Sequence, residues 1–219
     1  MYILDLFAGP FQIQGSRMTL PITDRTKVRR HRERGSHDRA VVDAILDAGL
    51  VCHVAFIGPG GPGGGPVVIP TIHVRVADHI YLHGSASNAM LRALGRGGET
   101  CIAVTLLDGL VLAKTAFHHS VNYRSVVLFG RAAEVTDFAE KRRVLDALIE
   151  KLEPGRSRAC RPANDKELAA TLVIGMPIVE ASAKIRTGPP LPEDDEDRSL
   201  PYWTGEIPLR VVRDPPIPA

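Results

Sequence analysis

Along most of the chain, apolar and β-branched runs alternate with short polar or glycine-containing breaks, a pattern typical of β-strands joined by turns. Such runs predict strands at residues 50–57, 67–76, 80–82, 100–107, 110–116, 123–135 and 171–183, the last with a bulge at Pro177. The break at 77–79 is short enough to predict an antiparallel hairpin, and a second turn is predicted at 108–109.

Helical spacing of apolar residues appears in fewer places. Residues 38–48 form one amphipathic pattern that ends at Gly49, residues 137–152 form a second, and residues 90–94 form a shorter one. Because strands follow one another without a helix after each, a parallel sheet is disfavoured. The sequence therefore predicts a mainly β fold, an antiparallel β-barrel with peripheral helices.

Composition narrows the class of protein. The 219 residues suffice for one domain with tails, and the formal net charge of +2 gives no electrostatic argument for nucleic-acid binding. No segment reaches the ~18–20 apolar residues of a membrane span. Cys52, Cys101 and Cys160 lack the spacing of a disulfide or metal motif, which favours a reducing, cytoplasmic compartment. The apolar start, residues 1–11, lacks the basic beginning of a signal peptide.

Two compositionally biased segments need interpretation. Residues 25–34 carry seven basic side chains, counting His31, and are interpreted as a solvated arm, with contact to a partner subunit or a cofactor phosphate as the alternatives. Residues 58–66 are rich in glycine, but their three prolines remove the N–H donors that a phosphate loop needs. We interpret this segment as a flexible connection between two strands.

The segment with the most chemistry is His83-Gly84-Ser85-Ala86-Ser87-Asn88, which leads from a strand into the helical run at 90–94. Backbone N–H groups, hydroxyls and a helix N-terminus converge there, so the segment is a candidate phosphate site. The alternative is that Ser85 or Ser87 only caps the helix.

Other candidate residues carry weaker signals. His118 and His119 are adjacent, so on a strand they would point to opposite faces, and a metal pair is disfavoured. His83 is expected to line a ligand pocket. Trp203, the only tryptophan, anchors the C-terminal tail or covers a ligand. We identify no nucleophilic triad and no paired carboxylates.

The ordered motifs VCHVAFI, VVIPTIHVR, IYLHGSASN, NYRSVVLFGRAAEV, ASAKIRTGPP and WTGEIPL together resemble a known family. The chain is similar to the pyridoxamine 5′-phosphate oxidase-like FMN-binding split barrels, in the flavin-nucleotide-binding branch related to 5-nitroimidazole-resistance proteins. The resemblance implies a six-stranded antiparallel Greek-key split barrel at 23–188, with an extension at 1–22 and an acidic, proline-rich tail at 189–219 that packs on the barrel. It also implies a homodimer with the cofactor at the subunit interface.

The resemblance further implies which residues contact the flavin. They are Pro70, Thr71 and Ile72 through backbone atoms, His83, Gly84, Ser85, Ser87 and Asn88 near the phosphate, and Arg124, Ser125, Lys184 and Trp203 around them. Oxidases of the superfamily carry an Arg-Lys pair for the phosphate where this chain has Asn88-Ala89. Arg92, Lys184 or the basic arm would then have to supply the charge, and pyridoxamine phosphate is a doubtful substrate.

Function follows from the resemblance as an expectation. The first hypothesis is an FMN-dependent oxidoreductase that acts on an unidentified small molecule, since a flavin needs few protein acids or bases. The alternative is a non-catalytic protein that binds, stores or senses flavin or haem, with a deazaflavin as another possible cofactor. A haem would be bound through His83 or His118. A third possibility is a structural dimer without cofactor.

Overall fold

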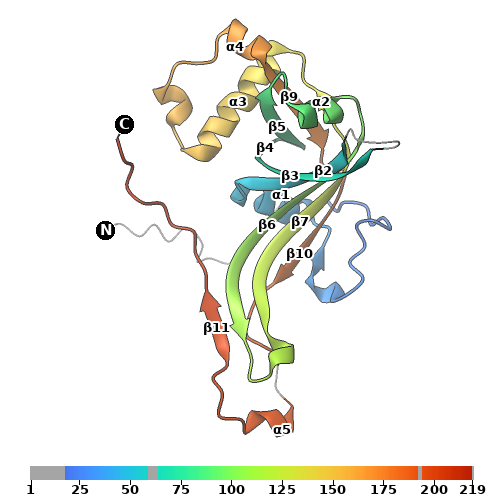
Figure 1. Ribbon diagram of the computed structural model, residues 1–219, viewed down its shortest axis with the longest axis vertical. Coiled ribbons are helices and arrows are strands. Elements are labelled where there is room, and N and C mark those ends of the chain that lie inside the picture. The colour runs from blue at the N-terminus through green and yellow to red at the C-terminus, as the bar shows by residue number, and fades with distance from the viewer. Residues whose placement is uncertain (1–17, 59–63, 192–193, 219) are drawn as a thin grey trace.

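The protein was analysed as a computed structural model that describes residues 18–58, 64–191 and 194–218 (Figure 1). The predicted N-terminal extension and the centre of the glycine-rich connection therefore lie largely outside the described residues. Within these ranges, two antiparallel sheets and several short helices make up the molecule.

The larger sheet has seven strands among the described residues. In spatial order they are β1 (Gly35–Ser36), β10 (Glu180–Arg186), β7 (Ser120–Arg131), β6 (Glu99–Leu112), β2 (Val51–Gly58) and β3 (Gly65–Ile72), while β11 (Gly205–Pro208) pairs with the last residues of β6. The smaller sheet is ordered β4 (Val74–Val76), β5 (His79–Ser85), β9 (Thr171–Pro177) and β8 (Ala133–Glu134). Among the described strands, the two sheets are hydrogen-bonded separately and do not close into one continuous sheet.

Helices lie around the sheets. They are α1 (Arg39–Ala48), α2 (Ala89–Gly95), α3 (Phe138–Leu152), α4 (Asp165–Ala170) and α5 (Asp195–Arg198), with 3-10 turns η1 (Arg32–Arg34), η2 (Ala116–His118) and η3 (Arg156–Ala159). The two long helices predicted from apolar spacing are confirmed, and Asp38 and Asp137 cap them by accepting backbone N–H bonds. The mainly β, antiparallel class with peripheral helices is confirmed. None of the described helices is long and apolar enough to span a membrane.

Three predicted strands each divide between the two sheets, because the apolar pattern does not reveal which sheet a strand joins. One is the strand predicted at 123–135, which ends as β7 at Arg131 and continues in the smaller sheet as β8 from Ala133. The strand predicted at 67–76 breaks at His73, where β3 leaves the larger sheet and β4 enters the smaller one. The strand predicted at 171–183 breaks after Pro177 in the same way. The predicted turn at Asp108–Gly109 is instead a bulge inside a continuous β6.

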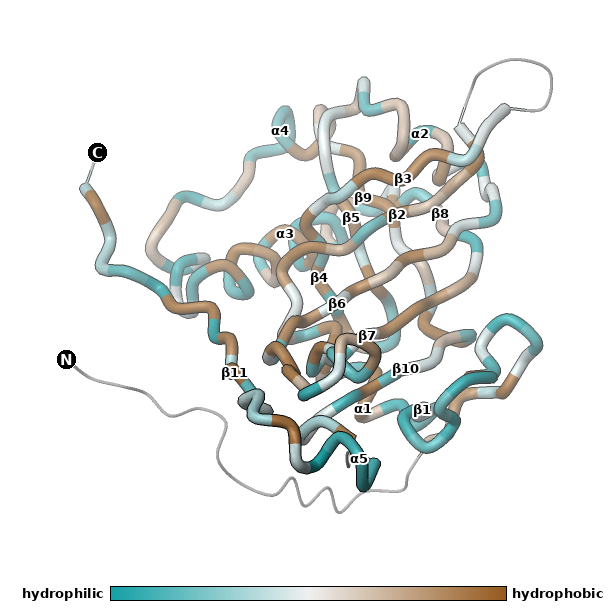
Figure 2. The backbone as a smooth tube through the Cα atoms, turned by 60° about the horizontal axis from the view of Figure 1, so that its bottom comes forward, coloured by the Kyte–Doolittle hydropathy of each residue, from teal (hydrophilic) through white to brown (hydrophobic). Residues whose placement is uncertain are grey.

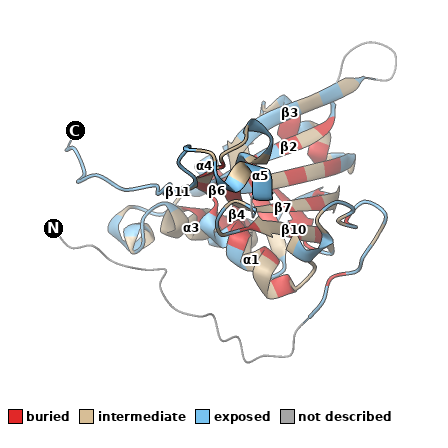
Figure 3. Cartoon of the chain, turned by 90° about the horizontal axis from the view of Figure 1, so that it is seen from below, coloured by how far each residue is buried: buried red, intermediate tan, exposed pale blue. Residues whose placement is uncertain are grey.

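The larger sheet has one covered and one open face. Alternate residues such as Val54, Ile102 and Leu128 are at most 1% exposed and join the main core with the apolar faces of α1 and α2 (Figure 3). A second, smaller core forms where Val144 and Leu148 of α3 pack on the smaller sheet. The opposite face of the larger sheet, the outer face, carries the residues between the core positions of β2, β6 and β7.

Candidate functional site

Two predicted site segments meet at the seam between the sheets. β3 ends at Ile72, and two residues later the β4–β5 ladder begins with Val74 paired to Tyr81, two residues before His83. Contacts between β3 and β5 agree with this placement. The seam therefore brings β3 into contact with β5, the two strands whose residues the family resemblance assigned to one flavin.

His83 is half-buried at this seam, and its Nδ1 atom is buried without a hydrogen-bond partner. Burial lowers the pKa of the imidazole, so the ring is neutral near pH 7. A buried N–H without an acceptor costs more than a buried lone pair, which favours the tautomer with its proton on Nε2. His83 can thus donate one hydrogen bond through Nε2 to a group bound at the seam.

The serines that follow remain accessible. The Ser85 and Ser87 hydroxyl oxygens lie 2.9 Å apart, and both residues are exposed. The cap of α2 is Asn88, whose side-chain oxygen accepts from the Leu91 N–H at 3.1 Å. A Cβ on Gly84 would lie 3.0 Å from the Leu91 side chain, so glycine here lets α2 pack closely on β5. Neither serine hydroxyl caps the helix, and both stay available to a ligand.

Arg92 supplies a positive charge to the same segment. Its Nε donates to the Ala86 carbonyl at 2.7 Å, which folds the exposed guanidinium back over the serine segment. Asn88 and Ala89 carry no charge, so Arg92 provides the cation that these positions lack. Arg92 was named from the sequence only as one of several possible sources.

Four predicted residues lie away from the seam. Ser125 and Lys184 face each other across β7 and β10 on the outer face, three and four strands from β3, and therefore roughly 14 and 19 Å from Ile72. Arg124 points to the other face, where it forms an ion pair with Asp108 at 2.7 Å. Trp203 precedes β11 and is 62% exposed at the far end of β6. Within one chain these four residues do not join the seam segments.

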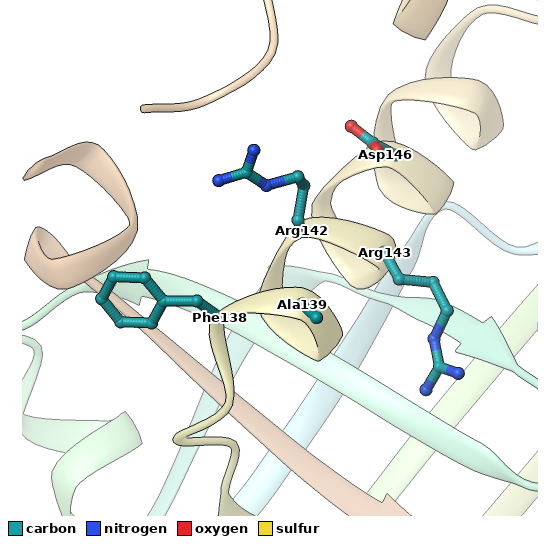
Figure 4. A pocket seen from close by; sticks show the side chains of 5 residues that line it. All are labelled: Phe138, Ala139, Arg142, Arg143 and Asp146. Carbon is teal, nitrogen blue, oxygen red and sulfur yellow. The ribbon is translucent and has the colours of Figure 1, made fainter. Parts of the chain in front are cut away.

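A shallow hollow of about 540 Å³ lies on α3 and is separate from the seam (Figure 4). Phe138, Ala139, Arg142, Arg143 and Asp146 line it, and Arg142 pairs with Asp165 of α4. No predicted site residue belongs to it, so the hollow does not identify the flavin site.

The tip of the β6–β7 ribbon holds His118 and His119, which the sequence disfavoured as a metal pair but of which His118 was a possible haem ligand. The His119 Nδ1 lies 2.9 Å from the Thr115 carbonyl and must donate to it, so in the neutral imidazole Nε2 is the nitrogen with the free lone pair. A ring fixed in this way is typical of histidines that ligate metals. No group of three metal-binding side chains occurs among the described residues. Sequence reasoning could not find this feature, because it depends on a folded hydrogen bond.

Residues 38–185, from the cap of α1 to β10, match the family model described as pyridoxamine 5′-phosphate oxidase. The chain belongs to this family. All predicted cofactor residues of the chain except Trp203 lie within the matched pyridoxamine 5′-phosphate oxidase region. No curated protein matches the chain.

Solved structures extend the likeness over nearly the whole chain. The flavocytochrome Anf3 from Azotobacter vinelandii is 42% identical, with a TM-score of 0.81 over 90% of this chain and 89% of the other. The FAD and haem binding protein from Mycobacterium smegmatis is 37% identical, with a TM-score of 0.79 over 85% and 89%. A candidate 5-nitroimidazole antibiotic resistance protein from Bacteroides thetaiotaomicron, 20% identical with a TM-score of 0.58 over 69% and 86%, shares the fold.

Proposed function

We propose that this chain is a flavin-dependent oxidoreductase that binds the FMN half of a flavin nucleotide at the β3–β5 seam. The observation that carries the proposal is the likeness, over nearly the full chain, to a flavocytochrome and to a protein that binds FAD and haem. When bound, the flavin supplies the electron or hydride chemistry, and the protein binds and orients it. The small-molecule substrate is not identified by these residues.

The seam offers groups that suit each part of the cofactor. Because β3 ends the order of the larger sheet and no further ladder joins it among the described residues, its backbone near Thr71 and Ile72 can meet the flavin ring. His83 adds a donor at Nε2. The Ser85 and Ser87 hydroxyls and the Arg92 charge suit a phosphate. FMN and FAD share all the flavin groups that these residues would contact.

We further propose a homodimer through the outer face. Large apolar side chains remain exposed there, including Val51 at 50%, Ile57 at 62%, Val68 at 60% and Leu107 at 49%. Exposed apolar patches of this extent mark interaction sites, and a second copy would cover them. Sedimentation should give about twice the chain mass of 23.7 kDa. A flavin-loaded monomer would contradict this part of the proposal.

The spectrum of the purified or reconstituted protein tests the cofactor. We expect two flavin bands, bleached under anaerobic conditions by NAD(P)H or another reductant, and mass spectrometry of the released flavin should find FMN or FAD. A protein that takes up neither flavin would contradict the proposal. A flavin that no reductant bleaches would favour a storage or sensing role. The cytoplasmic location stays a prediction.

A haem is the second candidate cofactor, favoured by the two similar proteins. The His119 imidazole, fixed with Nε2 unprotonated, suits haem iron better than His83, whose buried Nδ1 would have to carry the proton. After reconstitution, His119→Ala should lose the Soret band and retain flavin, whereas His83→Ala should retain the Soret band. Loss of the Soret band in His83→Ala alone would place the haem at the seam.

A further inference from the structure

Two exposed segments of opposite charge lie near the outer face, and the charges that the structure describes do not neutralise either of them. The basic segment contains Lys27, Arg30 and Arg32, and the acidic segment contains Asp194, Glu196 and Asp197. None of these six side chains forms an ion pair with another described residue, whereas many of the charges elsewhere on the surface do. Figure 2 shows both segments as hydrophilic stretches, one beside β1 and one at α5.

The basic segment runs from the end of the outer face where β6 begins to β1, the edge strand that pairs with Ala183 and Lys184 of β10. Arg25, at its start, bonds Glu99 at 2.9 Å and also Glu180, and its guanidinium lies 4.9 Å from the centre of the Phe129 ring. The side chains of Glu99, Phe129 and Glu180 belong to the outer face. On their strands these residues alternate with the residues that point into the core, and so do the residues paired with them on the neighbouring strands.

The acidic segment is fixed at the opposite end, beyond the last residues of β6. The Lys114 ammonium donates to the Leu200 carbonyl at 2.9 Å, and β11 then pairs with residues 109–112 of β6. The segment includes α5, which lies at the lower end of the molecule in Figure 1. Asp195 forms an ion pair with Arg198 at 3.0 Å. Asp194, Glu196 and Asp197 therefore account for the net negative charge of the segment.

The separation prevents these charges from meeting within one chain. β6 has 14 residues. At ~3.4 Å per residue its ends lie roughly 44 Å apart, and β1, which is level with Thr105, lies roughly 24 Å along the strand from Leu112. Exposed charges at physiological salt are screened beyond about 8 Å. Both segments therefore remain available to another molecule.

We infer that the basic segment of one copy docks on the acidic segment of a second copy, and that this contact fixes how the two outer faces align. The two copies would be related by a twofold axis that lies in the plane of the outer face. This axis passes midway between the two segments and is perpendicular to the line that joins them. The symmetry forms the contact twice and closes the dimer. Such charge complementarity sets orientation and association rate more than affinity. The inference rests on the proposed dimer and adds its geometry.

Charge-reversed variants of the full chain test the docking. The first is Lys27→Glu/Arg30→Glu/Arg32→Glu, the second is Asp194→Lys/Glu196→Lys/Asp197→Lys, and the third combines all six changes. At about 50 mM salt, where screening is weak, each triple variant should dimerise at least about tenfold more weakly by sedimentation equilibrium. The combined variant should recover to within about threefold of the original, because the ion pairs are restored with their signs exchanged.

A matched control reverses three exposed cations elsewhere, in η3 and α4, as Arg156→Glu/Arg158→Glu/Lys166→Glu. It changes the net charge by the same amount as the first variant and should shift the dimer constant by less than about twofold. Thermal unfolding of every variant verifies that it is folded. Unchanged dimerisation in both triple variants, or additive losses in the combined one, would overturn the docking while leaving the dimer intact. A monomeric original protein would instead overturn the dimer itself.

Discussion

The two faces of the larger sheet are built from the same strands, yet they differ in almost every physical respect. On β7, Val126 and Leu128 are at most 1% exposed and pack in the main core, whereas their neighbours Ser125 and Val127 face outward and are only half-buried. Because successive side chains on a strand point to opposite faces of the sheet, each residue belongs to one face only. The core face is aliphatic and covered by α1 and α2, while the outer face mixes apolar side chains with Ser125, Lys184 and exposed charges.

This difference separates folding from function. The free energy of folding comes mainly from the buried face, because burial of apolar area is the dominant favourable contribution. The outer face and the seam retain donors, charges and apolar groups that the single chain does not satisfy. Substitutions on the two faces should therefore have different consequences, which the following experiments measure.

The largest contrast compares two leucines. Leu128 is 1% exposed and Leu107 is 49% exposed. Leu128→Ala should lower the free energy of unfolding by about 2–5 kcal/mol, because it leaves a cavity in the core. Leu107→Ala should change it by less than about 1 kcal/mol at protein concentrations where the chain is monomeric, and should weaken dimerisation. Denaturant unfolding checks both values; equal losses would refute the division between the faces.

A smaller effect is expected where the chain passes from one sheet to the other. His73 is fully buried there, with Nε2 2.9 Å from the Leu46 carbonyl. Burial, aided by the nearby Lys151 ammonium, lowers the pKa of His73 to about 4. The unfolded chain binds this proton below about pH 6.5 and the folded chain does not, so stability is lost as pH falls from 6.5 toward 4.

At pH 5 this histidine alone should cost about 2 kcal/mol relative to pH 7. His73→Leu should remove that part of the pH dependence in urea titrations. An unchanged slope in His73→Leu would mean that His73 titrates normally in the folded protein.

The smallest effect is expected on the outer face. Lys184 makes no side-chain hydrogen bond or ion pair with the described residues, while Ala183 beside it is fully buried. Lys184→Ala should alter the free energy of unfolding by less than about 0.5 kcal/mol. A loss above about 1.5 kcal/mol in chemical denaturation would show that the outer face is structural after all.

The sequence pattern was sufficient for the class of fold and for most elements, since the apolar runs and helix caps are local signals. It was insufficient for sheet membership. Nothing in the run 67–76 marks His73 as the point where the chain changes sheets, and the same holds for Ile178, because pairing partners are distant in sequence. Asp108 and Gly109 suit a turn, yet β6 and β7 accommodate them as a bulge.

The candidate site was predictable to a similar extent. Resemblance to the family linked Pro70–Ile72 with His83–Asn88, and the seam brings them together. Alternation alone indicates that Arg124 and Ser125 point to opposite faces and cannot serve one group together within a chain. The positions of the Arg92 and His119 side chains depend on hydrogen bonds to backbone carbonyls, which no periodicity reveals.

The central claim is that the seam holds a flavin phosphate through Ser85 and Ser87, and a binding titration of FMN and riboflavin tests it most directly. Hydrogen bonds to a charged group are worth roughly 1.5–3 kcal/mol each, so Ser85→Ala/Ser87→Ala should weaken FMN at least about 100-fold. Riboflavin, which lacks the phosphate, should lose far less. The control Ser120→Ala/Ser199→Ala removes two exposed hydroxyls elsewhere and should leave both affinities unchanged. Equal losses for FMN and riboflavin, or no loss for either, would contradict a phosphate site at the seam.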